Sequence, residues 1–152
     1  MARGQNPALA RAPKRLSAEL SSTERAYFVS GFDGAEWDTP GIDSSESTYD
    51  ANFGAGTRAI GYADNADLGY SSFDGVDTSD GMEVLAKFTY YGDSDLNGQI
   101  NGTDFSLFGA GRSGAGTGWD FGDYDYSGGA PNGTDFSLFG AGLSSYRQFG
   151  SL

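Results

Sequence analysis

The sequence contains one passage twice: Asn101-Gly-Thr-Asp-Phe-Ser-Leu-Phe-Gly-Ala-Gly111 is identical to Asn132-Gly-Thr-Asp-Phe-Ser-Leu-Phe-Gly-Ala-Gly142. Each copy follows an acidic segment, Asp93-Ser-Asp-Leu-Asn-Gly-Gln-Ile before the first and Asp123-Tyr-Asp-Tyr-Ser-Gly-Gly-Ala-Pro before the second. The offset between the two passages is 31 residues. Because a repeat of fixed period builds the same supersecondary unit each time, residues 92–146 are expected to form two matching loop–helix units.

The spacing of oxygen-bearing side chains in each acidic segment is typical of a calcium-binding loop. Ca²⁺ takes about six to eight oxygen ligands, and a twelve-residue loop supplies them from positions 1, 3, 5, 7, 9 and 12, with glycine at position 6. The first loop then provides Asp93, Asp95, Asn97, the backbone carbonyl of Gln99, Asn101 and Asp104. The second provides Asp123, Asp125, Ser127, Asn132 and Asp135. One such segment alone is also a common solvated turn, but two copies favour two metal sites.

The two predicted calcium sites are not equivalent. The second loop is one residue longer than the first, and the surplus is expected around Gly128-Gly129. Ser127 also offers a short hydroxyl at position 5, where the first loop has the amide of Asn97. A glycine-rich loop loses more conformational entropy when it closes on an ion. We therefore expect two calcium ions, with the second bound more weakly.

The segments that precede the loops do not resemble helices. Residues 84–91 are rich in β-branched and aromatic side chains, which favour a strand. Residues 114–122 contain too much glycine to form a helix. Each unit is therefore expected to be a loop with an exiting helix only.

This pattern, with Asp at position 12, resembles the type I dockerin module, whose two EF-hand-like repeats (F-hands) are loop–helix units. The segment Val84-Leu-Ala-Lys-Phe-Thr-Tyr-Tyr-Gly-Asp-Ser-Asp-Leu-Asn-Gly98 is similar to the version that ends many large secreted proteins of planctomycete-type bacteria. The upstream segment Val29-Ser-Gly-Phe-Asp-Gly-Ala-Glu-Trp-Asp38 is similar to the part that commonly precedes such a dockerin-like pair. The resemblance implies a non-catalytic docking or anchoring module of an extracellular or cell-surface protein, with a cohesin-like protein domain as partner. It implies partner contacts at Gly102, Thr103, Ser106, Gly133, Thr134 and Ser137. Identical copies further imply two binding orientations of similar affinity.

Composition argues against several other classes of function. The formal net charge is −12, and most carboxylates follow residue 25, whereas nucleic acids and anionic membranes favour Lys and Arg. The chain has neither His nor Cys, which removes the usual zinc, haem and iron–sulfur ligands together with Ser–His and Cys–His catalysis. No apolar run approaches the length of a transmembrane helix. We therefore expect a monomer that is not an enzyme and binds neither nucleic acid nor membrane.

A second hypothesis stays open beside docking. The chain would then be a purely structural, calcium-stabilised C-terminal fragment of an adhesin-like or polysaccharide-degrading extracellular protein, without a partner of its own. Residues 1–22 contain no apolar run of the kind that a secretory signal needs. That absence fits a fragment or a wrongly assigned start.

The expected fold class is α+β. Residues 1–25 are expected to be a poorly ordered basic segment, 26–91 a small β-rich module, and 92–146 the tandem repeat. Strands are expected at 26–30, 58–63 and 82–91, and a short helix at 44–53. The side chains expected to fill the core of the first module are Phe28, Trp37, Phe53, Tyr62 and Phe73. In the repeats, Phe105 with Phe108 and Phe136 with Phe139 are expected to share a helix face and to pack against each other.

Overall fold

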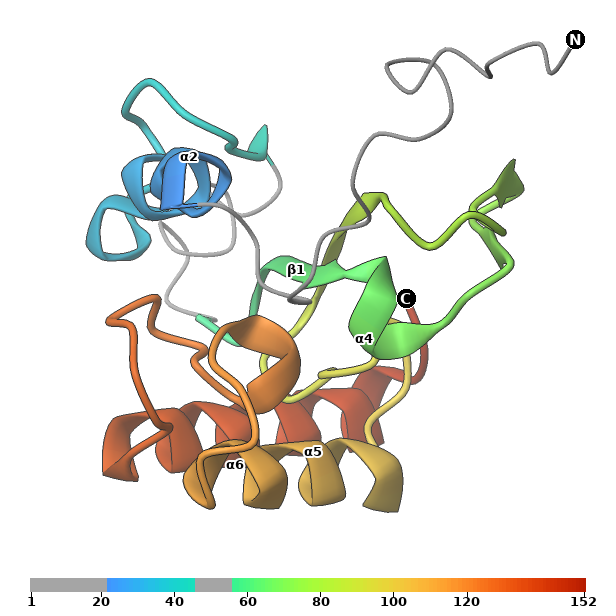
Figure 1. Cartoon of the computed structure of the whole chain (residues 1–152). Helices are drawn as coiled ribbons and strands as arrows, with labels where there is room; N and C mark the ends of the chain where they lie inside the picture. Colours follow the sequence, from blue (N-terminus) through green and yellow to red (C-terminus); the bar gives the residue numbers. More distant parts are fainter. Residues whose placement is uncertain (1–21, 46–55) are drawn as a thin grey trace, which may run out of the picture.

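The structure is a computed structural model that describes residues 22–45 and 56–152. Its fold is α+β, as expected from the sequence (Figure 1). The elements in chain order are α2 (Ser22–Phe32), the 3₁₀ helix η1 (Asp33–Ala35), β1 (Arg58–Asp64), α4 (Asn65–Leu68), β2 (Ser72–Phe73), β3 (Val76–Asp77), β4 (Val84–Tyr90), α5 (Gly102–Arg112), the 3₁₀ helix η2 (Trp119–Phe121) and α6 (Gly133–Phe149).

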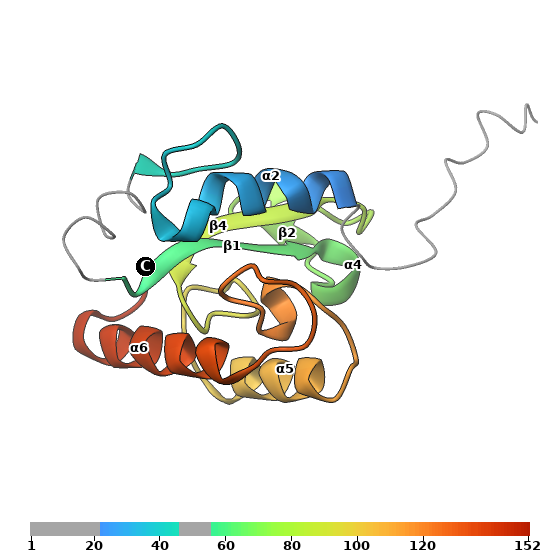
Figure 2. The ribbon, with the colours of Figure 1, turned by 90° about the vertical axis from the view of Figure 1, so that its left-hand side faces the viewer.

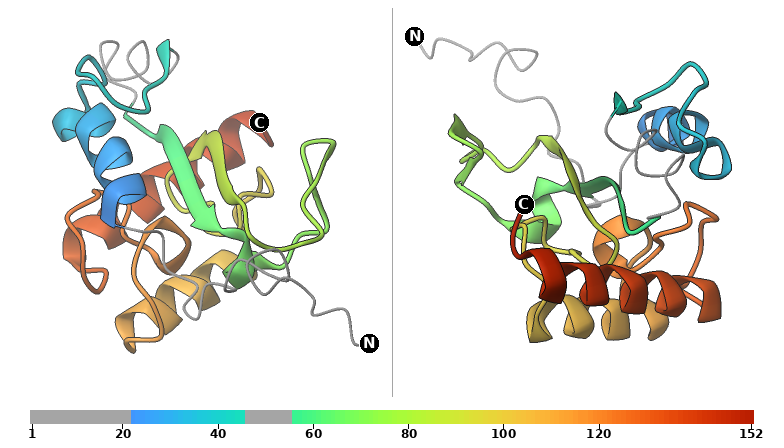
Figure 3. Two further views of the ribbon diagram at one scale, coloured as in Figure 1. Left: turned by 45° about the horizontal axis from the view of Figure 1, so that its top comes forward. Right: turned by 180° about the vertical axis from the view of Figure 1, so that it is seen from behind.

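An antiparallel pair of strands stands at the centre of the described structure. β1 and β4 pair along their whole length, from Arg58 opposite Tyr90 to Asp64 opposite Val84. Helix α2 lies on one side of this pair, and α5 and α6 lie on the other (Figure 2). α5 and α6 run side by side, with the two acidic loops between them and the strands (Figure 3).

Two of the three expected strands are confirmed, as β1 and β4. The short β2–β3 hairpin was not predicted; its turn residues Asp74 and Gly75 both have positive φ, as a two-residue type I′ turn requires. The helix expected at 44–53 falls almost wholly outside the described residues. Phe53 and the basic segment 1–21 also lie outside them.

The strand expected at residues 26–30 is wrong, because these residues belong to α2. Phe28 and Phe32 are four residues apart and share one face of this helix. Phe28 stacks on Tyr62 at 4.5 Å between ring centroids, and Phe32 stacks on Tyr126 at 4.4 Å. Packing of this face outweighs the weak strand preference of the local sequence. α2 begins at Ser22, so it crosses the expected boundary between residues 25 and 26.

Buried apolar side chains form one cluster that extends through the regions expected to be two modules. Of the aromatic residues expected in the first core, Phe28, Trp37 and Tyr62 are buried, whereas Phe73 is only partly buried. The same cluster contains residues from β4, the acidic loops and the long helices: Leu85, Leu96, Tyr124, Tyr126, Phe108 and Phe139. The expected boundary between residues 91 and 92 therefore does not separate two cores.

The paired phenylalanines of the repeats divide between core and surface. The expected packing of the two pairs against each other is confirmed by ring contacts, but only Phe108 and Phe139 are buried, whereas Phe105 and Phe136 are each 54% exposed. The helices are antiparallel, which places Phe105 beside Phe139 and Phe136 beside Phe108, at 5.9 and 6.0 Å between centroids. Residues three apart on a helix are offset by about 60°, so one ring of each pair lies toward the loops and the other lies at the solvent edge of the same face.

Two glycines of the repeated helices lie against neighbouring backbone. A Cβ atom at Gly142 would lie 1.7 Å from the carbonyl oxygen of Tyr91, and one at Gly111 would lie 1.9 Å from that of Phe121. Gly140, two residues from Gly142 on the same helix, has no atom within 4 Å of the corresponding position. In each copy of the repeated Gly-Ala-Gly motif, packing against neighbouring backbone therefore requires the second glycine but not the first.

We expect Gly142→Ala to destabilise the protein by about 3 kcal/mol, because backbone must shift to relieve the overlap. Gly140→Ala is the matched control and should stabilise by up to about 1 kcal/mol, since alanine favours the helix. Urea unfolding of both variants measures the two changes. Equal effects of the two substitutions would contradict the close contact between α6 and Tyr91.

Candidate metal centres

Each acidic loop brings three aspartates together. In the first centre, oxygen atoms of Asp93, Asp95 and Asp104 lie within 4.8 Å of one another, and in the second those of Asp123, Asp125 and Asp135 do the same. In each triad the first and last residues are buried and the middle one is partly buried. The two buried clusters could therefore each hold a metal ion.

The last aspartate of the first triad is fixed by backbone on both sides. Asp104 Oδ1 accepts hydrogen bonds from the N–H of Ser94 at 2.9 Å and of Asp95 at 3.3 Å. Asp104 Oδ2 accepts from the N–H of Asn101 at 2.8 Å. Asp104 is thus the acidic member of the capping box that starts α5. The same side chain that closes the loop also begins the helix.

The second triad repeats this arrangement. Asp135 Oδ1 accepts from the N–H of Tyr124 at 2.8 Å and of Asp125 at 3.2 Å, and Asp135 Oδ2 accepts from that of Asn132 at 2.8 Å. Asp135 is likewise the acidic member of the capping box of α6. The sequence repeat is therefore a repeat of hydrogen bonding as well.

The first aspartate of each triad accepts a hydrogen bond from the glycine at loop position 6. The N–H of Gly98 donates to Asp93 Oδ2 and that of Gly128 donates to Asp123 Oδ2, both at 2.9 Å. The two glycines also have nearly equal φ, 81° and 82°. The loops therefore match through position 6. The additional residue of the second loop comes after Gly128, close to where the sequence places it.

Burial and nearby negative charge raise the pKa values of Asp93 and Asp104 in the first centre. Burial raises the pKa of Asp93 to about 7, and the charges of Asp104 and Asp95 add to the increase, against hydrogen bonds from Thr89 and Gly98. Burial likewise raises the pKa of Asp104 to about 6, with Asp95 adding to it. Crowded carboxylates of this kind become more stable when a cation neutralises them.

The asparagines predicted as amide ligands accept hydrogen bonds from nearby backbone N–H groups. Asn101 Oδ1 accepts from the N–H of Thr103, and Asn132 Oδ1 accepts from that of Thr134, both at 2.8 Å. Both asparagines are thus N-caps of the following helices. Asn97 Oδ1 accepts from the N–H of Gln99 at 2.8 Å, within its own loop. Asn97, Gln99 and Ser127 are exposed at the loop surface.

The expected partner contacts all lie on the surface. Gly102, Thr103 and Ser106 of α5 and Gly133, Thr134 and Ser137 of α6 are exposed. The hydroxyls of Ser106 and Ser137 donate to the carbonyls of Gly102 and Gly133, at 2.8 and 3.0 Å. These residues occupy equivalent places at the start of the two helices.

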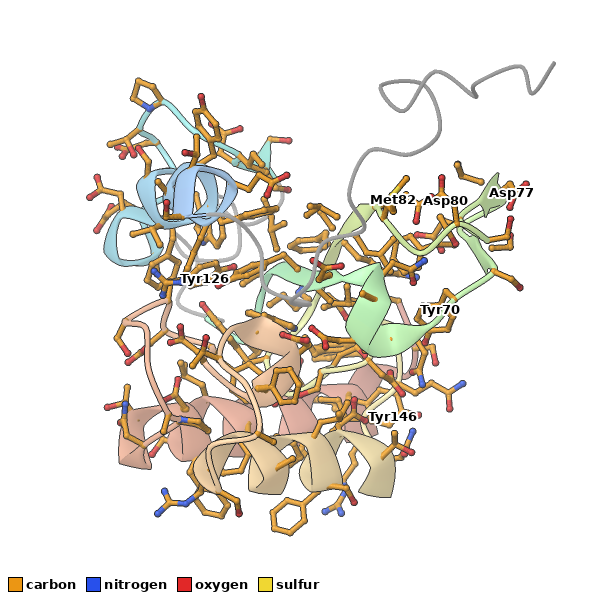
Figure 4. The ribbon with its side chains drawn as sticks, in the orientation of Figure 1. Tyr70, Asp77, Asp80, Met82, Tyr126 and Tyr146 are labelled. Atoms are coloured by element: carbon orange, nitrogen blue, oxygen red, sulfur yellow. The ribbon has the colours of Figure 1, made fainter. Side chains whose placement is uncertain are left out.

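Sequence reasoning missed the apolar residue at position 4 of each loop. Leu96 and Tyr126 are buried, and both have positive φ, 58° and 57°. Figure 4 places Tyr126 where α2 meets the second acidic loop. Alignment of the two loops could have shown this position, because both copies carry a large apolar or aromatic residue there.

Contacts between the loops and the core were also missed. Ser94 Oγ and Tyr124 OH, at position 2 of the two loops, are 2.7 Å apart and hydrogen-bonded. The indole Nε1–H of Trp119 donates to the carbonyl of Asp93 at 2.8 Å. Trp119 is fully buried. The first centre is therefore attached directly to an intrinsic fluorophore.

Comparisons of the chain with models of known protein families, with curated proteins and with solved structures give no match. The chemistry of the two centres must therefore be inferred from their geometry. Within residues 22–45 and 56–152, no helix is long and apolar enough to cross a membrane.

Asp120, in η2, is a buried carboxyl outside both triads. Its Oδ2 has no hydrogen-bond partner among the described residues. Burial raises the pKa of Asp120 to about 8, and the charges of Asp67 and Asp64 add to the increase. The folded protein therefore holds a proton at Asp120 in a range where the unfolded chain, with a carboxyl pKa near 4, has lost it.

Because the folded state binds the additional proton, we expect the contribution of Asp120 to stability to be complete below about pH 4. It should be lost as pH rises through about 8. Asp120→Asn removes this titration, so the variant should gain stability relative to the original protein between pH 5 and pH 9. Urea unfolding at each pH measures the gain, with the exposed Asp43→Asn as control. If the free energy of unfolding changed with pH in the same way for Asp120→Asn and the original protein, the raised pKa of Asp120 would be contradicted.

Proposed function

We propose that this chain is a non-catalytic calcium-binding docking module, built from two EF-hand-like loop–helix units in the manner of a type I dockerin. The observation that carries the proposal is the pair of buried aspartate triads. Each is oriented by backbone N–H groups and tied to the first turn of a repeated helix. We assign no catalytic role to these carboxylates, because loop closure and helix capping account for their positions.

Calcium is the ion that suits these centres best. The ligands available in the loops are oxygen atoms of carboxylates, amides, hydroxyls and backbone carbonyls, which hard cations prefer. The chain contains neither His nor Cys, so softer metals lack their usual ligands. Mg²⁺ requires near-ideal octahedral geometry and retains water, whereas Ca²⁺ accepts the irregular, larger shell of a twelve- or thirteen-residue loop. Extracellular calcium sites can be weak, which fits the proposed location outside the cell or on its surface.

The proposed docking face is formed by the outer sides of α5 and α6. It contains the six exposed contact residues at the helix starts together with the exposed rings of Phe105 and Phe136. Exposed aromatic rings are frequent anchors of protein interfaces. A cohesin-like domain that covers this face is the partner that we propose, and the chain itself would be a monomer.

The two ends of this face are not equivalent. A pocket of about 350 Å³ lies at the start of α5 and is lined by Ile100, Asn101, Gly102, Phe105, Phe139, Leu143 and Arg147. At the corresponding end of α6, Arg112 Nη1 donates to the carbonyl of Pro131 at 3.4 Å, so this side chain lies over the equivalent position. Arg112 corresponds to Leu143 in the other repeat. The two binding orientations implied by identical copies would therefore differ in affinity.

A structural role without a partner is the second candidate. It is favoured by the insertion of Leu96 and Tyr126 into the shared core, because calcium would then stabilise the whole fold. One experiment distinguishes the docking function from the structural role: calcium-dependent capture of a cohesin-like domain encoded in the same genome. Calcium-dependent folding without such capture would favour the structural role.

Calorimetric titration should reveal two calcium ions, with the first centre tighter by about tenfold, or about 1.4 kcal/mol. The second loop loses more entropy on closing because of its additional residue. Asp93→Ala should therefore reduce stability in calcium more than Asp123→Ala. In the single-tryptophan variant Trp37→Phe, the fluorescence of Trp119 should follow occupancy of the first centre. Two equal sites, or a tighter second one, would contradict this order.

Phe105 and Phe136 offer a matched test of the docking face, since they are equally exposed in identical local sequence. Phe105 lines the open pocket and Phe136 does not. We expect Phe105→Ser to weaken binding of the cohesin-like partner by at least tenfold, about 1.4 kcal/mol. Phe136→Ser should weaken it by less than threefold. Surface plasmon resonance in calcium measures both, and equal losses would show that the two orientations are equivalent.

A further inference from the structure

The first aspartate of each triad has a different additional partner. In the first centre, the hydroxyl of Thr89 donates to Asp93 Oδ2 at 2.5 Å. In the second, the guanidinium of Arg25 donates from Nη2 to Asp123 Oδ2 at 3.0 Å. A neutral hydroxyl and a positive charge therefore stand at equivalent positions beside two otherwise matching carboxylates.

Arg25 belongs to α2 and is held against the second loop by more than one contact. Its Nη2 also donates to the carbonyl of Tyr126 at 3.0 Å, and a Cβ atom at Gly128 would lie 3.0 Å from the same nitrogen. The Arg25 side chain is 31% exposed and that of Asp123 is 1% exposed. The ion pair is therefore closed off from solvent on the Asp123 side. Stacking of Phe28 and Phe32 on Tyr62 and Tyr126 fixes the helix that carries Arg25.

We propose that Arg25 is a positioning residue of the second metal centre, which neutralises Asp123 before calcium binds and lowers the calcium affinity of this centre relative to the first. The inference rests on the proposed calcium-binding function. Arg25 bonds to Oδ2, which also accepts from Gly128, while Oδ1 is approached by the hydroxyl of Ser127 at 3.4 Å. Arg25 can thus remain in place while Oδ1 faces the ion.

Charge determines the direction of the effect. A guanidinium bonded to one oxygen of Asp123 lies a few ångströms from an ion bound to the other. Like charges at such a distance repel appreciably where solvent is partly excluded. Thr89 exerts no such repulsion on the first centre. Without calcium the effect is reversed, because Arg25 relieves part of the repulsion among the three carboxylates of the second triad.

The contact also couples the second centre to α2. If calcium at the second centre weakens the pairing of Arg25 with Asp123, then loss of that pairing must strengthen calcium binding by the same factor. Arg25 and Asp123 are 98 residues apart in the chain. The proposed coupling therefore joins the first described helix to the second repeat.

Arg25→Gln tests the proposal, because glutamine keeps a hydrogen-bond donor and removes the charge. In calorimetric titration of the full chain, we expect calcium affinity at the weaker centre to rise about tenfold, with less than a twofold change at the tighter one. Lys87→Gln, the same loss of one positive charge on β4, where Lys87 pairs with exposed Asp74 at 3.1 Å, should leave both affinities within about twofold. Arg25→Lys, which keeps the charge, should stay within about threefold of the original at the weaker centre.

An unchanged or lower affinity of the weaker centre in Arg25→Gln overturns the inference. A merely structural role for Arg25 would lower thermal stability equally with calcium and with chelator, and would not raise affinity. A tenfold rise in Arg25→Lys would also overturn it, even if Arg25→Gln failed to fold. If the original protein binds no calcium, the proposed function itself fails. If it binds two ions and Arg25→Gln does not alter the second, only the present inference fails.

Discussion

Negative charge held at close range inside the protein is the constraint on which the described structure depends. Two triads of aspartates converge in buried positions, and backbone N–H groups orient their oxygens. Such hydrogen bonds lower the cost of burying a carboxylate, but they do not remove the repulsion between carboxylates 4.8 Å apart or less. Asp104 and Asp135 carry this charge at the start of α5 and α6, where the helix dipole favours it. Loop closure, helix initiation and the proposed cation binding therefore involve the same side chains.

The loops and the core cannot change shape independently. Leu96 and Tyr126 hold left-handed backbone conformations that cost non-glycine residues roughly 1–2 kcal/mol, and burial of their side chains offsets that cost. Trp119 bonds to the backbone of the first loop and packs between Tyr91 and Tyr124, at 5.7 and 5.1 Å between centroids. Any movement of a loop on binding an ion must thus be transmitted to the cluster beneath β1 and β4. Metal binding and folding are then expected to be linked throughout the described chain, because this cluster is continuous.

Local patterns predicted the parts of the fold that depend on local chemistry. β-branched and aromatic residues indicated β4, and the repeated passage indicated that a helix follows each acidic loop. Helix α2 was missed because its aromatic residues favour a strand locally, and only the distant rings of Tyr62 and Tyr126 make the helical face favourable. The aspartate triads followed from spacing alone. Arg25 could not be predicted, since nothing in the sequence around it indicates a partner 98 residues away.

The asymmetry between the two halves has its origin mostly outside the repeated passage. The helices begin with identical residues, yet one buried carboxylate meets Thr89 of β4 and the other meets Arg25 of α2. The divergence continues just after the identical passage, where Leu143 lines an open pocket and Arg112 lies over Pro131. An internal duplication fixes the geometry of each loop and helix start, because those contacts lie within about twelve residues of one another. It cannot fix the electrostatic surroundings of each triad or the shape of each end of the α5–α6 pair, because Thr89, Arg25, Arg112 and Leu143 lie outside the identical passage. Two copies of one sequence can therefore form two candidate metal centres and two helix ends with different surroundings.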